Sequence, residues 1–447
     1  MVRFLNRRVI LPLSDLIQDL RISESLDFLS ESQFWQYDRL IDYQNNRLKK
    51  LLEFVYENVP FYKNWFNTQS IRPSDIRGIS DLYLLPIITK SEIRNNPELF
   101  LPRQRQNKKS IKLCSSGSTG EPFSYFISGE AFSLKYAAAL RGWSWMGYEL
   151  GDSYAKLSQN KRNSLLKKVQ DVVNRCLYIY IPDLSKQSLL NTIEILKKNQ
   201  PEYLRCYPDP LYFAAKIMQE RNQKLSGIKA INTTGNILTP EARNLIEESF
   251  GCPVFDSYSC EGSALFYEGP TRESYLGSME YAVTEIIDNN NQQVVDKGKG
   301  FHITTDLHNY AMPLIRYNTQ DLIEKTGNKS SCGRSLFSIN KVIGRENDIL
   351  VTPSGNHLIV HLFTIYFEYF PSVLQFQIEQ TGTHEFIFRF VVDKSFNNEI
   401  ISEIHKYWQD FLGINVHLSI EIHDSIPLLY SGKRRFLIRN PEIKLGI

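Results

Sequence analysis

Apolar and polar positions alternate with different periods along this chain, and each period predicts a different kind of element. Residues 13–70 place apolar side chains at helical spacing. Helical spacing returns at 129–150 and at 239–251, where Thr239 suits the N-cap and Gly251 the C-terminal stop. We therefore expect a helical start of the chain and two further helices before residue 260.

Alternation with a period of two dominates the later part of the chain. Between about 276 and 325 it predicts a series of strands. After Gly344, three alternating segments surround one helical segment at 397–412, a combination that predicts an α+β module. We place the domain boundary near 344, where the sequence IGREND separates two apolar runs. The expected domains are 1–343, with residues 1–80 a largely helical lead-in, and 344–447.

Length and composition describe an ordinary folded protein. A chain of 447 residues is too long for one compact core. The net charge is only +3 and no basic block is long, so we expect no nucleic-acid partner. The N-terminal apolar run lacks a cleavage site, and no stretch approaches the roughly 18 apolar residues of a transmembrane segment. Six single cysteines favour reduced thiols, and therefore a cytoplasmic protein.

Residues 115–120, with the sequence SSGSTG, place six small residues between two alternating segments. A plain hairpin turn needs only about two to five residues. Backbone N–H groups in a Gly-rich turn, with hydroxyls beside them, can hold phosphate oxygens. No Gly-Lys-Ser/Thr follows, so this is not a Walker loop, and the run alone is equally compatible with a solvated loop.

Five further segments follow in order: TTGNILTPEAR, VFDSYSCEG, TTDLHNYAMPLIRYNTQD, IGREND and SGKRRF. Together with the Ser/Gly run they resemble the motifs of the adenylate-forming superfamily, in particular its phenylacetate–CoA ligase-like and CapK-type (capsular polysaccharide biosynthesis) branch. The resemblance covers residues from about 80 to 438 and rests on the order and spacing of six motifs. It implies an α/β fold with a large multi-sheet N-terminal adenylate-forming domain and a small, mobile α+β C-terminal domain.

The resemblance also implies an ATP site and its residues. Asp321 would hold the ribose hydroxyls, since a carboxylate accepts hydrogen bonds from both. Lys433 would be catalytic, a cation meeting the charge between the acid and the α-phosphate. Glu261 would bind Mg²⁺, and Tyr207 would line the acid pocket. The residues assigned to ATP are Ser115, Ser116, Gly117, Ser118, Thr119, Gly120, Thr234, Gly235, Asn236, Asp256, Tyr258, Ser259, Asp321 and Arg345.

Each of these side chains also has a purely structural interpretation. Asp321 can be a turn residue at a strand end, and Asp256 can cap a turn. Lys433 can belong to a solvated basic turn, and Arg345 can pair with a surface acid. Tyr207 can be a core aromatic.

The chain departs from the resembled pattern at several positions. Asn236 stands where an acid is common, and Gln320 replaces the glycine of RY-x-x-GD. Glu121 stands beside the loop proline, where a lysine is usual, and Glu261 lies one residue nearer to the tyrosine. Ser330 replaces the first cysteine of a zinc-binding Cys-x-Cys-Gly-Arg element, so we expect no zinc.

The implied function is ATP-dependent activation of a carboxylic acid as acyl-AMP, with Mg²⁺, followed by acyl transfer to coenzyme A. A first alternative is transfer to an amine on a sugar or amino acid, giving an amide in capsule or O-antigen polysaccharide biosynthesis. A second is an inactive nucleotide-binding scaffold, which the altered motif positions keep open. In either enzymatic case the small domain would rotate about the junction at 344–348.

Overall fold

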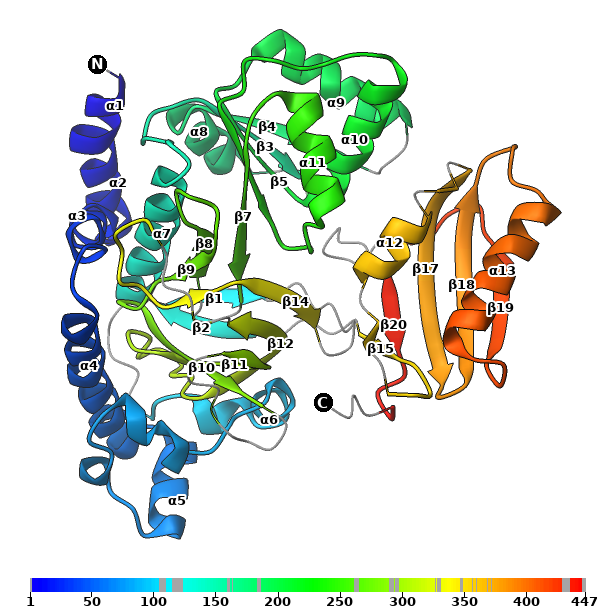
Figure 1. Ribbon diagram of the computed structural model, residues 1–447. Helices are drawn as coiled ribbons and strands as arrows, with labels where there is room; N and C mark the ends of the chain where they lie inside the picture. The colour runs from blue at the N-terminus through cyan, green and yellow to red at the C-terminus, as the bar shows by residue number, and fades with distance from the viewer. Residues whose placement is uncertain are drawn as a thin grey trace. The chain divides into compact units, whose positions relative to one another are not determined.

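The computed structural model describes most of the chain, and it divides into two compact units (Figure 1). The first unit takes up most of the chain as far as Val342, and the second covers Ile343–Ile447 together with Gln320–Leu322. The described residues are 2–103, 110–114, 124–158, 161–162, 164–182, 186–260, 265–288, 293, 297–325, 327, 331–345, 349–355, 357–358, 360–367, 369–370, 372–427 and 435–443. Among them, no helix is long and apolar enough to cross a bilayer.

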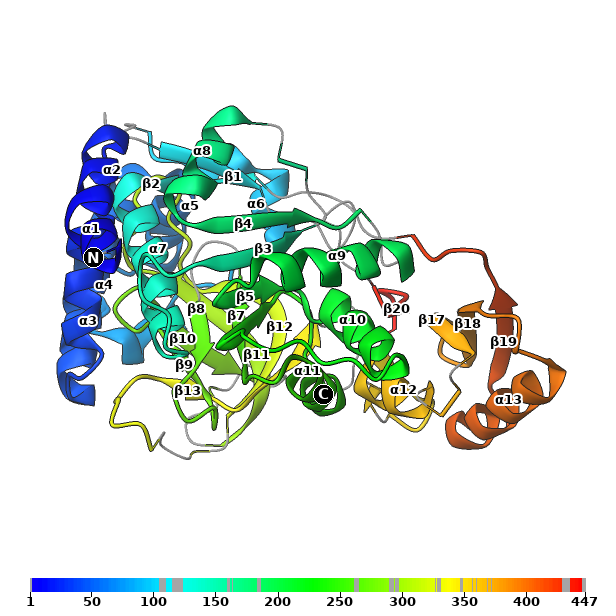
Figure 2. The same ribbon diagram turned by 90° about the horizontal axis from the view of Figure 1, so that it is seen from above.

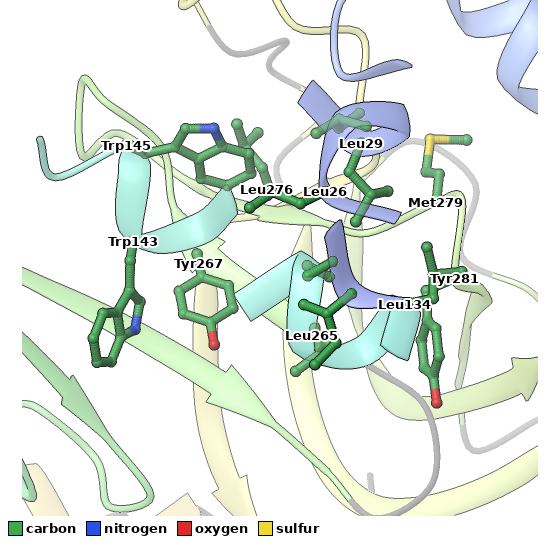
Figure 3. Packing of buried hydrophobic residues seen from close by; sticks show 14 of the residues in the cluster. Leu26, Leu29, Leu134, Trp143, Trp145, Leu265, Tyr267, Leu276, Met279 and Tyr281 are labelled. Carbon is green, nitrogen blue, oxygen red and sulfur yellow. The ribbon is translucent and has the colours of Figure 1, made fainter. Parts of the chain in front are cut away.

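The chain begins with helices, as its apolar spacing predicts. They are α1 (Val2–Leu5), the π-helix η1 (Asn6–Ile10), α2 (Leu11–Gln18), α3 (Ile22–Ser32), α4 (Tyr37–Asn58), α5 (Pro60–Gln69), η2 (Pro73–Asp75), η3 (Ile79–Leu84), α6 (Lys90–Asn95) and η4 (Pro97–Phe100). Helix α3 packs Leu26 and Leu29 onto α7 (Gly129–Ser144), which contributes Leu134 to the same core. Figure 3 shows these side chains gathered with Leu265 and Tyr267.

An eight-stranded sheet in the order β13-β9-β8-β7-β6-β5-β3-β4 forms the centre of the first unit. Its parallel strands are β3 (Tyr154–Ser158), β4 (Cys176–Tyr180), β5 (Tyr203–Cys206), β6 (Ala230–Thr234) and β7 (Val254–Ser259); the antiparallel edge is β8 (Leu265–Glu268), β9 (Tyr275–Gly277) and β13 (Ser338–Ile339). The connecting helices are α8 (Leu165–Val173), α9 (Lys186–Asn199), α10 (Pro208–Glu220) and α11 (Pro240–Phe250).

Helices α9, α10 and α11 cover one face of the parallel strands, as the two views agree (Figures 1 and 2). Their apolar side chains meet those that the strands direct to this face, including Ala155, Leu204 and Ile231. The predicted ends of α11 are confirmed: the Thr239 hydroxyl accepts a hydrogen bond from Ala242 N at 3.2 Å, and Gly251 ends the helix at a φ of 63°.

Two smaller sheets lie before residue 346. Strands β1 (Ser110–Cys114) and β2 (Ser124–Ser128) pair in antiparallel register, so the segments that flank the Ser/Gly run are strands, as expected. Strands β10 (Ala282–Ile287), β11 (Gly298–Asp306), β12 (Tyr317–Lys325) and β14 (Lys341–Arg345) form a second sheet in that order. The strands predicted from 276 to 325 are therefore present.

The second unit is the predicted α+β module. Its elements are β15 (Leu350–Val351), β16 (His357–Leu358), α12 (Val360–Phe367), β17 (Val373–Gly382), β18 (Glu385–Val392), α13 (Asn398–Leu412), β19 (His417–Ile422) and β20 (Leu437–Arg439). The sheet order is β19-β18-β17-β20, and Trp408 of α13 stacks on Phe363 of α12 with ring centroids 4.4 Å apart. The side chain of Asn397 caps α13 by accepting from two backbone N–H groups.

Candidate nucleotide and acid site

The carboxyl ends of β5, β6 and β7 meet at one edge of the large sheet. Cys206 lies opposite Thr233 in register, and Thr234 lies opposite Ser257. The three expected site segments that end or follow these strands therefore lie at the same edge: Tyr207, Thr234–Asn236 and Tyr258–Ser259. Ligands of open parallel sheets bind beyond the carboxyl ends of the strands.

Two helices begin at this edge. Tyr207 is the N-cap residue of α10, Thr239 is the N-cap residue of α11, and each helix has a proline in its first turn. The first N–H groups of a helix lack intrahelical acceptors and carry the positive end of the dipole. This edge is therefore electrostatically suited to phosphate or carboxylate groups.

Asn236, which stands where an acid is common, has a specific partner. Its Nδ2 donates to Oδ2 of Asp209, in the first turn of α10, at 2.6 Å. An acid at position 236 would bring two carboxylates together, so the amide suits this neighbour. Gly235, before it, has a φ of 86°, a conformation that favours glycine. The amide thus joins the β6–α11 turn to the start of α10.

Asp256 lies below this edge in a closed network of hydrogen bonds. Oδ1 accepts from the Thr233 hydroxyl at 2.6 Å, and Oδ2 accepts from the Tyr275 hydroxyl at 2.8 Å. The backbone N of Asp256 donates to Glu268, whose carboxylate pairs with Arg243 at 2.6 Å. Burial, and then the charge of Glu268, raise the pKa of Asp256 to about 7. Both carboxyl oxygens are occupied from within the sheet, as expected of a structural residue.

Tyr258 faces the second sheet of the same unit. Its hydroxyl lies 2.9 Å from Nδ1 of His302, a buried residue of β11. Burial lowers the pKa of His302 to about 3, so its ring stays neutral. The Tyr258–His302 contact joins the two sheets next to Ser259, which ends β7 and is exposed.

Two cations lie side by side on the sheet face opposite α9 and α10. Lys156 of β3 lies opposite Arg205 of β5 and opposite Tyr178 of β4 in register. Both cationic side chains are half-buried, and among the described residues neither forms an ion pair. Burial, and then the charges of Arg205 and Arg162, lower the pKa of Lys156 to about 8. This pair was not predicted, because the short strands β3 and β5 carry no clear alternation of apolar and polar residues.

Asp321 lies in β12 and is buried, and it belongs with the second unit. The residue before it, Gln320, has a φ of 62°, a conformation that glycine adopts without steric cost. The chain thus keeps a backbone that favours glycine although the glycine itself is replaced.

The segment LIRYNTQD also contains a structural arginine. Arg316 pairs with the buried Glu285 at 3.1 Å and donates to Leu85 O at 2.6 Å.

Asn309, in the segment TTDLHNYAMP, holds strand β2 in place, a role that the sequence motifs did not predict. Its Oδ1 accepts from the backbone N–H groups of Ser128 and Ala311, at 3.1 and 3.2 Å. Its Nδ2 donates to the carbonyls of Phe126 and Met312, at 2.8 and 3.0 Å. Asn309 therefore fixes β2, the strand that follows the Ser/Gly run. The sequence feature that indicates this role is an asparagine shortly after an aspartate that ends a strand.

Several expected site residues lie outside the described residues: Ser115, Ser116, Gly117, Ser118, Thr119, Gly120, Glu261 and Lys433. Arg345 ends β14, and only its backbone is described. No group of three or more His, Cys, Asp or Glu side chains in the described ranges is arranged to hold a metal ion. The roles expected of all these residues, including Mg²⁺ binding by Glu261, stay predictions.

Known proteins resemble this chain along most of its length. Residues 350–440 match the family described as the CapK C-terminal domain. Protein CapK of Staphylococcus aureus is 26% identical over 417 residues, which cover 90% of this chain and 89% of CapK. A phenylacetate–coenzyme A ligase of Thermus thermophilus is 24% identical over 344 residues, covering 71% of this chain and 73% of the ligase. This chain is therefore similar to CapK and to phenylacetate–coenzyme A ligases.

Solved structures of a CoA ligase share the fold. The crystal structure of 2-hydroxyisobutyryl-CoA ligase in the postadenylation state, in complex with R3-HIB-AMP, matches with a TM-score of 0.68 and 18% identity over 89% of each chain. The same ligase in the thioesterification state, in complex with 2-HIB-AMP and CoA, matches with a TM-score of 0.58. The predicted adenylate-forming fold class is therefore confirmed.

Proposed function

We propose that this chain is an AMP-forming ligase that activates a carboxylic acid with ATP and transfers the acyl group to coenzyme A. The observation that carries the proposal is the carboxyl edge of the parallel sheet. Two helix starts, the turn 234–236 and Tyr207 meet there, in a chain of the adenylate-forming fold. The phenylacetate–coenzyme A ligases and the 2-hydroxyisobutyryl-CoA ligase support coenzyme A as the acceptor.

In the first half-reaction, a carboxylate oxygen of the acid attacks the α-phosphorus of ATP. The bond from that phosphorus to the bridging oxygen breaks, and pyrophosphate leaves with the electron pair. Thr234, Gly235 and Asn236 line the adenine, and Asp321 holds the ribose. Mg²⁺, when bound, neutralises phosphate charge. Lys433 stabilises the charge that develops between the acid and the α-phosphate.

Lys156 and Arg205 attract and orient the acid in this scheme. Neither has a carboxylate partner among the described residues, and Tyr207 follows Arg205 by two positions at the end of β5. Two cations that hold the same carboxylate fix its position, so little further entropy is lost when the bound acid reacts. A pair of cations on one sheet face also favours acids that bear a second anionic or strongly polar group.

In the second half-reaction, the acceptor attacks the acyl carbonyl, AMP leaves, and a thioester or an amide forms. Rotation of the small domain about the junction at 344–348 withdraws Lys433 and admits the acceptor. One observation favours an amine as a second candidate acceptor. Residues 350–440 match the CapK C-terminal domain family, and the similarity to CapK covers more of the chain than that to the coenzyme A ligases.

The test is magnesium-dependent pyrophosphate release, with hydroxylamine present to trap the acyl-adenylate. A panel of aryl, fatty, hydroxy and amino acids is run beside the Lys433→Ala variant. We expect hydroxamate from one acid class and its loss in the variant. Absence of both ATP binding and pyrophosphate release would contradict the ligase and the nucleotide-binding scaffold alike.

The acceptor is then assigned with the acid so identified. Coenzyme A and a set of amino sugars and amino acids replace hydroxylamine in parallel reactions. A thioester with coenzyme A supports the first candidate. An amide product together with silence towards coenzyme A would favour the CapK-type reaction.

A further inference from the structure

Helix α8 presents its apolar side chains to solvent. Five of its nine residues are exposed Leu or Val, with Leu166 at 83% and Val172 at 78% of full exposure. The exposed apolar residues of α8 are Leu165, Leu166, Val169, Val172 and Val173. The helix buries one side chain, that of Asp171. An amphipathic helix of a globular protein normally has the reverse orientation.

Polar contacts hold α8 in this orientation. Arg162 donates to both carboxyl oxygens of Asp171 at 2.9 Å. The same guanidinium lies over the ring of Tyr178 in β4, 4.3 Å from its centroid. The ion pair and the stacked tyrosine form the inner face of the helix, so the apolar face is directed away from the sheet.

The N-terminal helical segment has a second exposed apolar surface. Residues 2–18 form α1, η1 and α2, and Arg8 lies exposed among their apolar side chains. Leu16 and Ile17 are 80% and 75% exposed. The exposed apolar residues of this segment are Val2, Phe4, Leu5, Val9, Leu13, Leu16 and Ile17.

The two surfaces are neighbours at the turn around Gly151. Arg175, two residues after α8, donates to Gly151 O at 2.9 Å. Arg3 of α1 lies on the other side of this turn, where its guanidinium pairs with Asp152 at 2.6 Å and with Glu149 at 2.7 Å. Figures 1 and 2 agree that α1, α2 and α8 lie in the same part of the first unit. We call the exposed apolar residues of α8 and of residues 2–18 the apolar surface.

The charges around the α8 part of the apolar surface are predominantly positive. Residues 161–175 contain Lys161, Arg162, Lys167, Lys168 and Arg175 against Asp171 alone, so five basic residues minus one acidic residue give a net charge of +4. Lys167 and Lys168 are exposed within α8 itself. Aliphatic side chains on one face with lysines beside them are typical of helices that lie in the interface of an anionic bilayer.

We propose that the apolar surface docks this protein reversibly onto an anionic lipid bilayer. The leucine and valine side chains of α8 enter the boundary between headgroups and acyl chains, and Lys167 and Lys168 contact lipid phosphates. Residues 2–18 add a second inserted segment beside it. The acceptor or product of the ligase reaction would then be met at a membrane surface.

A second copy of this chain suits the surface less well. A two-fold interface places the same patch of each subunit against the other, and so brings together two segments that each carry a net charge of +4. An anionic bilayer supplies the missing negative charge as well as an apolar phase. Charge complementarity therefore favours lipid.

The test is cosedimentation of the full chain with vesicles of phosphatidylcholine alone or with phosphatidylglycerol. We expect binding to the anionic vesicles that falls with added salt, and at least about tenfold weaker binding to the neutral ones. Leu166→Gln with Val169→Gln, and separately Lys167→Gln with Lys168→Gln, should each weaken binding by about tenfold or more. No substrate is needed, so the result is independent of the ligase proposal.

Matched controls come from the second unit. Ile414→Gln with Ile422→Gln removes exposed apolar side chains, and Lys394→Gln with Lys406→Gln removes exposed lysines. Vesicle binding should be unchanged in both controls, and circular dichroism should show that every variant is folded. The proposal is overturned if the wild-type chain does not bind anionic vesicles, or if the controls lose binding equally. Concentration-dependent dimers that the α8 variants abolish, without vesicle binding, would also overturn it and assign the surface to a second copy.

Discussion

Two polar clusters on the same sheet differ in how many of their charged groups have hydrogen-bond or ion-pair partners. Around Asp256, donors reach both carboxyl oxygens, and Arg243 neutralises the adjoining Glu268. Around Lys156 and Arg205, two cations lie opposite each other, and neither has an ion-pair partner among the described residues. A closed network stabilises the fold, whereas an open one has binding capacity left for a ligand. The motif VFDSYS draws attention to the first cluster, yet the second is the one that the proposed function assigns to the substrate.

The largest expected effect comes from breaking the closed network. Arg243→Met leaves the buried Glu268 carboxylate unpaired beside Asp256, and we expect a loss of about 3–5 kcal/mol in the free energy of unfolding. Arg272→Met is the matched control, because the Arg272–Glu247 pair is more exposed and should contribute at most about 1 kcal/mol. Denaturant titrations of both variants measure the difference. Equal losses in the free energy of unfolding would show that the Arg243–Glu268 pair stabilises the fold no more than the exposed Arg272–Glu247 pair does.

A pH-dependent effect should identify Asp256 itself. Its folded pKa of about 7 lies above the usual value, so the folded state holds a proton that the unfolded state releases. The free energy of unfolding of the wild type therefore falls as pH rises from about 4 to about 7, whereas that of Asp256→Asn lacks this pH dependence. We expect Asp256→Asn to gain about 2–4 kcal/mol relative to wild type over that interval. Parallel unfolding curves at pH 5 and pH 8 test this, and a constant difference contradicts it.

The open cluster should affect substrate binding rather than stability. We expect Lys156→Met or Arg205→Met to raise the KM for the acid about 10- to 100-fold while the unfolding midpoint stays nearly unchanged. Because the pKa of Lys156 is lowered to about 8, wild-type KM should also rise above pH 8 as the ammonium is lost. That rise should be absent in Lys156→Met. Variants that unfold early but bind the acid normally would show that this pair, too, is structural.

The smallest expected effect concerns Gln320. Its φ of 62° costs a non-glycine residue about 1 kcal/mol, so Gln320→Gly should be more stable than Gln320→Ala by about that amount. Comparing the two variants removes the contribution of the glutamine side chain from the measurement. An alanine variant as stable as the glycine variant would mean that the backbone relaxes at this position.

The sequence predicted the parts of the fold in which local patterns are strong. The helical start, the capped helix α11 and the alternating strands of the second unit follow from spacing and from residues such as Thr239 and Gly251. The parallel strands β3, β4, β5 and β6 were not predicted, because they are four or five residues long and lack regular alternation. Of the candidate site, only the residues that lie within the recognised motifs were predicted. Lys156 and Arg205 are 49 positions apart in sequence and become neighbours only through strand pairing.

The exposed helix α8 was equally hidden from sequence reasoning. Its apolar spacing is that of an ordinary buried face, and only the ion pair of Arg162 with Asp171 shows that the face points outward. Hydrophobic periodicity identifies a helix and its apolar face, but tertiary contacts decide whether protein or solvent meets that face.

Acid-dependent exchange of labelled pyrophosphate into ATP is the decisive test of the ligase proposal, because it reports adenylate formation before any acceptor is involved. We predict exchange that requires one class of carboxylic acid, needs no coenzyme A or amine, and disappears in Lys433→Ala. Exchange that persists undiminished in Lys433→Ala would contradict the assigned mechanism. A folded chain that neither binds ATP nor catalyses exchange with any acid would contradict the ligase itself.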